Sequence, residues 1–99
     1  MPRVRLSARA RLDLEDIQDH GLIEFGLAAT RNHMAGFEKV FALLRRHPRA
    51  GQLREEFGQG IRAFSHAPHR ILYRLQADDV LIVRVLHTAM RSRFASGKH

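Results

Sequence analysis

Apolar and polar residues alternate over residues 3–6, and this period of two predicts a short strand with Val4 and Leu6 on one face. Ser7 follows at a position where its hydroxyl can cap the free amides of a first helical turn. From residue 8 onward the apolar spacing becomes four and three, which is one stripe of an amphipathic helix. The stripe comprises Ala10, Leu14, Ile17 and Gly21. We therefore expect a first helix that ends between Gly21 and Gly26.

A second helical pattern covers residues 27–46. Its apolar stripe has the same spacing and comprises Thr30, Met34, Phe37, Phe41 and Leu44. Arg45, Arg46 and His47 place positive charge at its C-terminus, where the helix dipole favours cations. Pro48 then blocks continuation of the helix. The two helices, separated by a short connector, are predicted to form an antiparallel hairpin.

The rest of the chain changes to strand patterns over residues 61–66, 69–76 and 80–87. The third is apolar on both faces except for Arg84, which favours a central position in the sheet. The order strand, helix, helix, strand, strand, strand predicts an α+β fold, with one domain spanning residues 1–99. The helical hairpin should cover one face of a three-stranded antiparallel sheet and leave the other face free to carry Arg and His side chains.

Three sequence stretches follow one another in a specific order. They are SARARLDLEDIQDH, then HPRAGQLREEF followed by GIRAF, then HRILYRL followed by VLIVRVLHTAMR. In order and spacing they resemble the RelE/ParE superfamily of toxins, and ParE more closely than RelE. The chain departs from that pattern at Gln18 and His20, where ParE relatives commonly have an aromatic pair, and at its Ala89-Met90-Arg91 ending, where relatives continue Ala-Arg-Asp.

The resemblance implies the toxin component of a type II toxin–antitoxin system. ParE-like proteins bind DNA gyrase and trap it on cleaved DNA without chemistry of their own, so no enzyme activity is the main expectation. A ParD-like antitoxin with an acidic C-terminal segment holds them inactive in a hetero-oligomer. RelE-like relatives instead enter the ribosome and cleave mRNA, so a ribosome-dependent, metal-independent endoribonuclease is the alternative.

Charge adds a second line of argument. Seventeen basic residues oppose ten acidic ones, giving a net charge of +7, and all the basic residues except Lys39 and Lys98 are arginines. Arginine recognises carboxylate and phosphate through a planar fork, which indicates anionic partners, although a GC-rich genome also inflates arginine. The excess of positive charge lies mainly after residue 57.

The candidate residues for binding the antitoxin or target are Arg62, Arg70, Arg74, Arg84, His87 and Arg91. Arg70, Arg74 and Arg84 are expected to share one sheet face as a cationic patch, unless each only solvates that face or pairs with a nearby Asp or Glu.

Ribonuclease chemistry needs a base, a cation for the developing phosphorane charge and an acid. In the alternative reading Arg70 supplies the cation, His87 a second catalytic group, and Glu56 or its neighbour Glu55 the base. In a purely structural interpretation, Arg70 is a surface cation and His87 is a residue at the end of a strand. The acidic residues of the first helix are interpreted as a solvated helix face rather than a catalytic cluster; they are Asp13, Glu15, Asp16 and Asp19.

Several classes of site are not expected. The chain has no cysteine, so disulfides and thiolate metal sites are excluded. Its seven histidines show no metal-ligand spacing, and we expect neither a metal nor a cofactor. No apolar run reaches the length of a secretory signal or of a membrane span, so a cytoplasmic protein without a membrane partner is expected.

Overall fold

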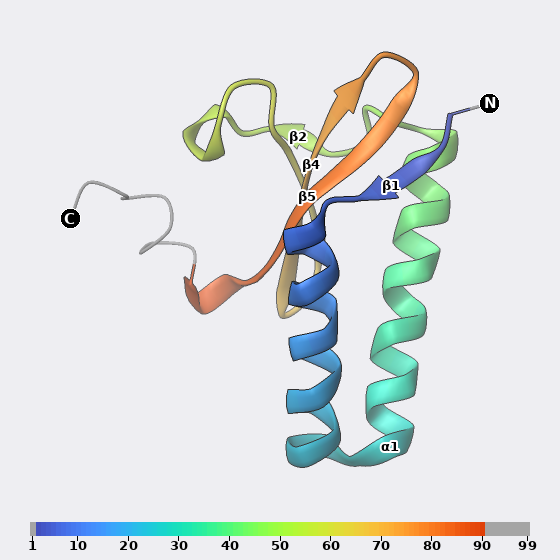
Figure 1. Cartoon of the computed structure of the whole chain (residues 1–99), viewed down its shortest axis with the longest axis vertical. Helices are drawn as coiled ribbons and strands as arrows, with labels where there is room; N and C mark the ends of the chain where they lie inside the picture. The colour runs from blue at the N-terminus through green and yellow to red at the C-terminus, as the bar shows by residue number, and fades with distance from the viewer. Residues whose placement is uncertain (1, 91–99) are drawn as a thin grey trace.

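A five-stranded sheet packs against two helical arms in the computed structural model, which describes residues 2–90 (Figure 1). The strands are β1 (Val4–Leu6), β2 (Gln52–Leu53), β3 (Arg62–His66), β4 (His69–Gln76) and β5 (Asp79–His87). Their order is β1-β5-β4-β3-β2, with β1 parallel to β5 and the other pairs antiparallel. Two short 3-10 helices, η1 (Glu55–Phe57) and η2 (Thr88–Met90), flank the sheet strands. No helix within this described part is both long and apolar enough to cross a membrane.

The helical part is one element, α1 (Ala8–Arg46), which reverses direction at Gly26 (Figure 1). Gly26 has φ 86° and ψ 176°, a conformation that costs glycine little and other residues much more. The predicted antiparallel hairpin with a short connector therefore differs from the structure in detail, because Gly26 alone leaves the helical conformation within α1. The predicted cap is confirmed, since the amide of Ala10 donates to Ser7 Oγ at 2.9 Å.

The α+β class is confirmed, but the three-stranded antiparallel sheet is wrong in its extent. β1 joins the sheet in parallel with β5, in a register that pairs Val4 with Val80 and Leu6 with Ile82. This pairing joins residues more than seventy positions apart, which a local periodicity cannot reveal. β2 has only two residues and is too short to show a period. The strand predicted to be central, β5, is not an edge strand, since it lies between β1 and β4, but the middle strand of the five is β4.

The main core lies between α1 and the sheet. Phe37 is 1% exposed and Tyr73 is fully buried, and both pack in one cluster with Ile82 and Leu44. Tyr73 Oη donates to the carbonyl of Pro48 at 2.7 Å and accepts from the amide of Gly51 at 2.8 Å. Burial raises the pKa of the Tyr73 phenol. The predicted apolar stripe of the second helical arm thus rests on the sheet, and Tyr73 of β4 holds the loop that follows α1.

The opposite sheet face carries a second, smaller core, which corrects the expectation of an open face. Ile61, Leu72 and Leu86 are buried there, with Phe57 packed against them. Residues 54–61 are folded back by short-range backbone bonds, including one from the amide of Ile61 to the carbonyl of Gly58. The two core clusters lie on opposite faces because side chains alternate along β4.

Candidate functional site

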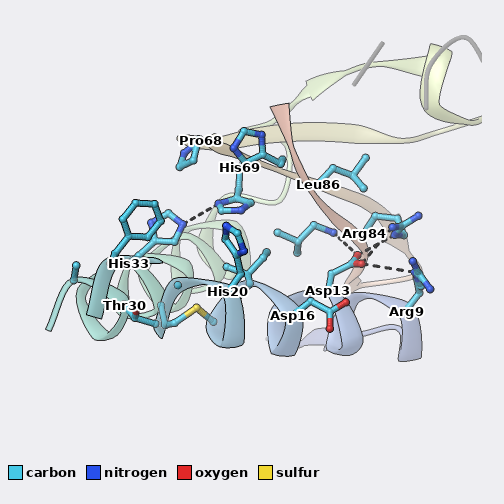
Figure 2. Close-up of a pocket in the computed structure, with 17 residues that line it drawn as sticks. Arg9, Asp13, Asp16, His20, Thr30, His33, Pro68, His69, Arg84 and Leu86 are labelled. Atoms are coloured by element: carbon cyan, nitrogen blue, oxygen red, sulfur yellow. Dashed lines mark hydrogen bonds and ion pairs between the residues drawn. The ribbon is translucent and has the colours of Figure 1, made fainter. Parts of the chain in front are cut away.

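A groove of about 570 Å³ runs between α1 and the C-terminal end of β5 (Figure 2). Both arms of α1 line it, together with the turn before β4 and residues 84–87 of β5. The apolar wall includes Ile17, Phe25, Ala29 and Met34. One end is formed by Arg9, Asp13 and Arg84, and histidines gather towards the other (Figure 2). Such a mixture of apolar surface and separate polar ends suits a polypeptide partner.

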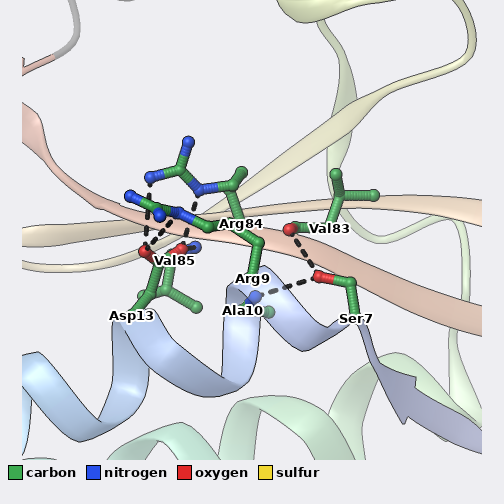
Figure 3. A network of polar contacts seen from close by, with 7 residues as sticks. All are labelled: Ser7, Arg9, Ala10, Asp13, Val83, Arg84 and Val85. Atoms are coloured by element: carbon green, nitrogen blue, oxygen red, sulfur yellow. Dashed lines mark hydrogen bonds and ion pairs between the residues drawn. The ribbon is translucent and has the colours of Figure 1, made fainter.

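Asp13 closes the first end of the groove as a buried carboxylate. It is 8% exposed and accepts from Arg84 Nε at 2.9 Å, Arg84 Nη2 at 3.2 Å and the amide of Val85 at 2.9 Å (Figure 3). Arg9 Nε approaches it to 3.7 Å. At the N-cap of the same helix, Ser7 Oγ donates to the carbonyl of Val83 at 2.8 Å. The interpretation of Asp13 as part of a solvated helix face is wrong, because its carboxylate joins the helix start to β5.

The predicted cationic patch of Arg70, Arg74 and Arg84 loses Arg84. Arg70 and Arg74 lie on the sheet face away from α1, because they alternate along β4 in phase with Leu72 of the second core. The register places Arg84 opposite Leu72, so its backbone position belongs to the same face. Its guanidinium nevertheless binds Asp13 at 2.9 Å, beside the amide of Val85, where β5 extends past its pairing with β1. The alternative that an arginine pairs with a nearby carboxylate thus holds for Arg84.

The remaining candidate cations have separate positions. Arg62 Nη1 donates to the carbonyls of Gly51 at 2.8 Å and Arg49 at 3.4 Å, so it fixes the loop after α1. Arg74 is exposed and His87 lines the groove. Arg91 lies outside the described residues. The five candidates within the described residues therefore do not form one surface.

Two residues of the ribonuclease alternative, Arg70 and His87, lie on opposite faces of the sheet. Arg70 is on the face away from α1, whereas His87 lies on the groove side, with its ring centroid 5.4 Å from that of His69. Glu56 forms an ion pair with Arg54 at 2.6 Å, and Glu55 Oε2 accepts from the amide of Gly60 at 3.2 Å. Arg70 and His87 therefore do not face one reaction site.

Histidines form a cluster at the second end of the groove. His33 Nε2 lies 2.9 Å from His69 Nδ1, and the ring of His33 stacks on that of His66 with centroids 4.3 Å apart. His66 Nε2 is 2.9 Å from the carbonyl oxygen of His33, and Phe37 packs edge-on against both stacked rings. His20, from the first arm of α1, faces the same end (Figure 2). Between residues 2 and 90 no group of side chains is arranged to hold a metal ion.

Burial is the main cause that lowers the pKa of His69 to about 4, and the neighbouring His33 and His87 lower it further. The pKa of His33 is lowered by burial and by His66. No spacing in the sequence indicates this cluster, because its members come from α1, β3, β4 and β5. It is a product of the tertiary fold.

The lowered pKa of His69 predicts how the free energy of unfolding depends on pH. The folded-state pKa of His69 lies below its unfolded value of 6.5, so between these values only the unfolded chain takes up the proton. We expect the free energy of unfolding to be highest above pH 6.5, and to fall as the pH is lowered from 6.5 to about 4. Urea unfolding along this pH series measures it. His69→Gln should show a weaker decline than the unmodified protein, and equal declines would contradict the assignment to His69.

Comparison with known proteins gives a consistent result. The family model for the ParE toxin of type II toxin–antitoxin systems, parDE, matches residues 4–92. Toxin ParE1 of Caulobacter vibrioides is 31% identical over 93 residues, which are 94% of this chain and 96% of that protein. Toxin ParE3 of the same organism is 36% identical over 74% of this chain and 73% of that protein.

Solved structures agree with the fold. A chain of the chromosomal ParDE toxin–antitoxin system of P. aeruginosa superposes with a TM-score of 0.76 at 19% identity, over 88% of this chain and 96% of that chain. The toxin–antitoxin complex RelBE2 of Mycobacterium tuberculosis contains a chain with a TM-score of 0.63 at 29% identity, over 88% and 99% of the respective chains. The first likeness concerns the fold alone.

Proposed function

Because this chain belongs to the ParE toxin family of type II toxin–antitoxin systems, we propose that it inhibits DNA gyrase by direct binding and is held inactive by a ParD-like antitoxin. The observation that carries the proposal is the match to the ParE family over residues 4–92, almost the whole chain. In this proposal the protein acts in the cytoplasm by binding its target and not by catalysis. With its antitoxin it forms an inactive hetero-oligomer.

The placement of Arg70 and His87 supports a binding role over ribonuclease chemistry. A phosphorane cannot receive a cation from one face of the sheet and a proton from the other. Arg84 is an equally poor catalytic candidate, because Asp13 holds it in a bidentate ion pair. An acidic partner can still use Arg74, which is exposed on the face away from α1.

The groove beside α1 is the proposed seat of the antitoxin. Its apolar lining includes Ile17 and, next to the turn of α1, Phe25, which is 70% exposed. Leu22, Ile23 and Leu27 extend this apolar surface around the turn, with exposures of 40%, 82% and 56%. A contiguous exposed apolar surface of this kind is typical of a protein interface.

Controlled expression in cells tests the function. Induction of the protein alone should stop growth and trigger the DNA-damage response, and purified protein should block supercoiling by gyrase. Co-expression of the product of the neighbouring reading frame should restore growth and co-purify with it. If instead induced cells cleave mRNA within ribosomes and Arg70→Ala or His87→Ala abolishes that cleavage with the fold intact, the endoribonuclease reading replaces the proposal.

Replacement of Phe25 tests the proposed antitoxin seat. Phe25→Ala should weaken binding of the neighbouring frame's product by about 10-fold or more, since truncation of an aromatic anchor costs about 2 kcal/mol at an interface. The thermal midpoint should change little, because the side chain is 70% exposed. Leu53→Ala, which removes a side chain of 52% exposure in β2, is the matched control and should bind normally. Equal losses in both variants would place the antitoxin elsewhere. Calorimetric titration measures the affinities.

A further inference from the structure

Four histidines from three elements meet at the second end of the groove. His20 and His33 come from the two arms of α1, His69 from β4 and His87 from β5. We propose that this histidine end is a carboxylate-binding subsite, which holds an acidic side chain of the polypeptide segment seated in the groove. The inference rests on the partner-binding role proposed above and adds the chemistry that the partner must carry.

The acidic residues of the groove lie away from the histidine end, which leaves this end open to an anion. The acidic residues of the groove lining are Asp13 and Asp16 of the first arm of α1, which lie at the other end with Arg9 and Arg84 (Figure 2). Asp13 is already occupied by Arg84 and the amide of Val85. The second arm contributes His33, β3 contributes His66, and β4 and β5 contribute His69 and His87. Among the described residues that line the groove, imidazoles thus face the histidine end without a carboxylate beside them.

The hydrogen bond between His33 and His69 limits how the cluster takes up protons. One of the two facing nitrogens must accept, so the pair can carry one extra proton and keep this bond. Burial and the neighbouring histidines disfavour even that proton and hold the pKa of His69 at about 4. A carboxylate placed within hydrogen-bond distance reverses the balance, because an opposite charge favours the imidazolium. Binding of an acid and uptake of a proton are therefore coupled.

The shape of the groove selects a polypeptide rather than a free small acid. The histidine end continues into the apolar wall of Ile17, Phe25 and Met34, within one volume of about 570 Å³. A segment with an acidic residue followed by apolar side chains can fill both parts. The net charge of +7 adds attraction for such an acidic segment.

The size of the pH effect follows from linkage. If a bound carboxylate returns the pKa of His69 from about 4 to its ordinary 6.5, affinity should be about tenfold higher near pH 5.5 than near pH 7.5. The probe is a synthetic amphipathic peptide of leucine and glutamate, titrated into the full chain at near-physiological salt. Histidine ring signals followed by NMR should report a raised pKa of His69 in the peptide complex.

Variants separate the subsite from general attraction to a basic protein. His69→Gln should abolish most of the pH dependence. His20→Gln/His87→Gln, which changes two exposed side chains, should weaken binding near pH 5.5 even if His69→Gln does not fold. His47→Gln, at the far end of α1, is the control and should retain the tenfold ratio. A ratio near one, equal losses in the control, or equally strong binding of acetate at the same carboxylate concentration would overturn the subsite.

Failure of the carboxylate-binding subsite can be distinguished from failure of the proposed function. A pH-independent peptide titration beside normal inhibition of gyrase and normal antitoxin binding removes the subsite alone. A pH-dependent titration without any effect on gyrase or any antitoxin removes the toxin function and leaves the subsite in place.

Discussion

Replacing Asp13 with alanine is expected to lower the free energy of unfolding by about 3 kcal/mol, a large part of the ~5–15 kcal/mol typical of a small domain. The substitution removes the acceptor for both Arg84 nitrogens and for the amide of Val85. Arg84 then keeps a charge in a site where its side chain is 19% exposed, and the amide of Val85 loses its bond inside the fold. The cost of these unmatched groups exceeds the value of the ion pair itself.

Urea unfolding measures the change, and Asp16→Ala is the matched control. Asp16 lies on the same arm of α1 but is exposed, so its loss should change stability by less than about 0.5 kcal/mol. The double variant Asp13→Leu/Arg84→Met should recover most of the loss, because apolar side chains of similar size can replace a buried ion pair. If the double variant is as unstable as Asp13→Ala, the loss of stability comes from altered packing and not from the uncompensated charge of Arg84.

Phe37→Ala is expected to lower the free energy of unfolding by about 3–5 kcal/mol, at least as much as Asp13→Ala. The ring loses its burial, and a cavity remains in its place. The ring is 1% exposed and lies with its centroid 5.0 Å from that of His33, 4.7 Å from that of His66 and 6.4 Å from that of Phe41. Its removal also opens the histidine cluster to water. The pKa of His69 should therefore rise towards its ordinary value, since burial is the main cause of its shift.

Calorimetric unfolding and histidine NMR titration provide the two measurements for Phe37→Ala. Phe25→Ala makes the same chemical change at a side chain of 70% exposure and should leave both stability and the His69 pKa close to their original values. If the two phenylalanine variants lose equal stability, the assignment of Phe37 to the core is wrong. If stability falls but the His69 pKa stays near 4, the neighbouring histidines and not burial control it.

Local patterns were sufficient for the parts of the fold that local energetics control. The Ser7 cap, the apolar stripe through Phe37, Phe41 and Leu44, and the three strands from residue 62 onward were all predicted from spacing and side-chain type. The toxin family was also recognisable from sequence stretches, and the family match over residues 4–92 confirms it. These features depend on residues within a few positions of one another, so a single sequence carries their signal.

The tertiary structure alone decided which polar residues are buried and which share a site. Asp13 looked like a surface acid until the parallel pairing of β1 with β5 brought Arg84 beside it. The ion pair with Asp13 takes the guanidinium of Arg84 away from Arg70 and Arg74, and the reversal of α1 at Gly26 brought His20 and His33 to one end of the groove. Each of these contacts joins residues distant in the chain, and the free energy of burying a charge depends on the partner that folding supplies, which periodicity does not encode.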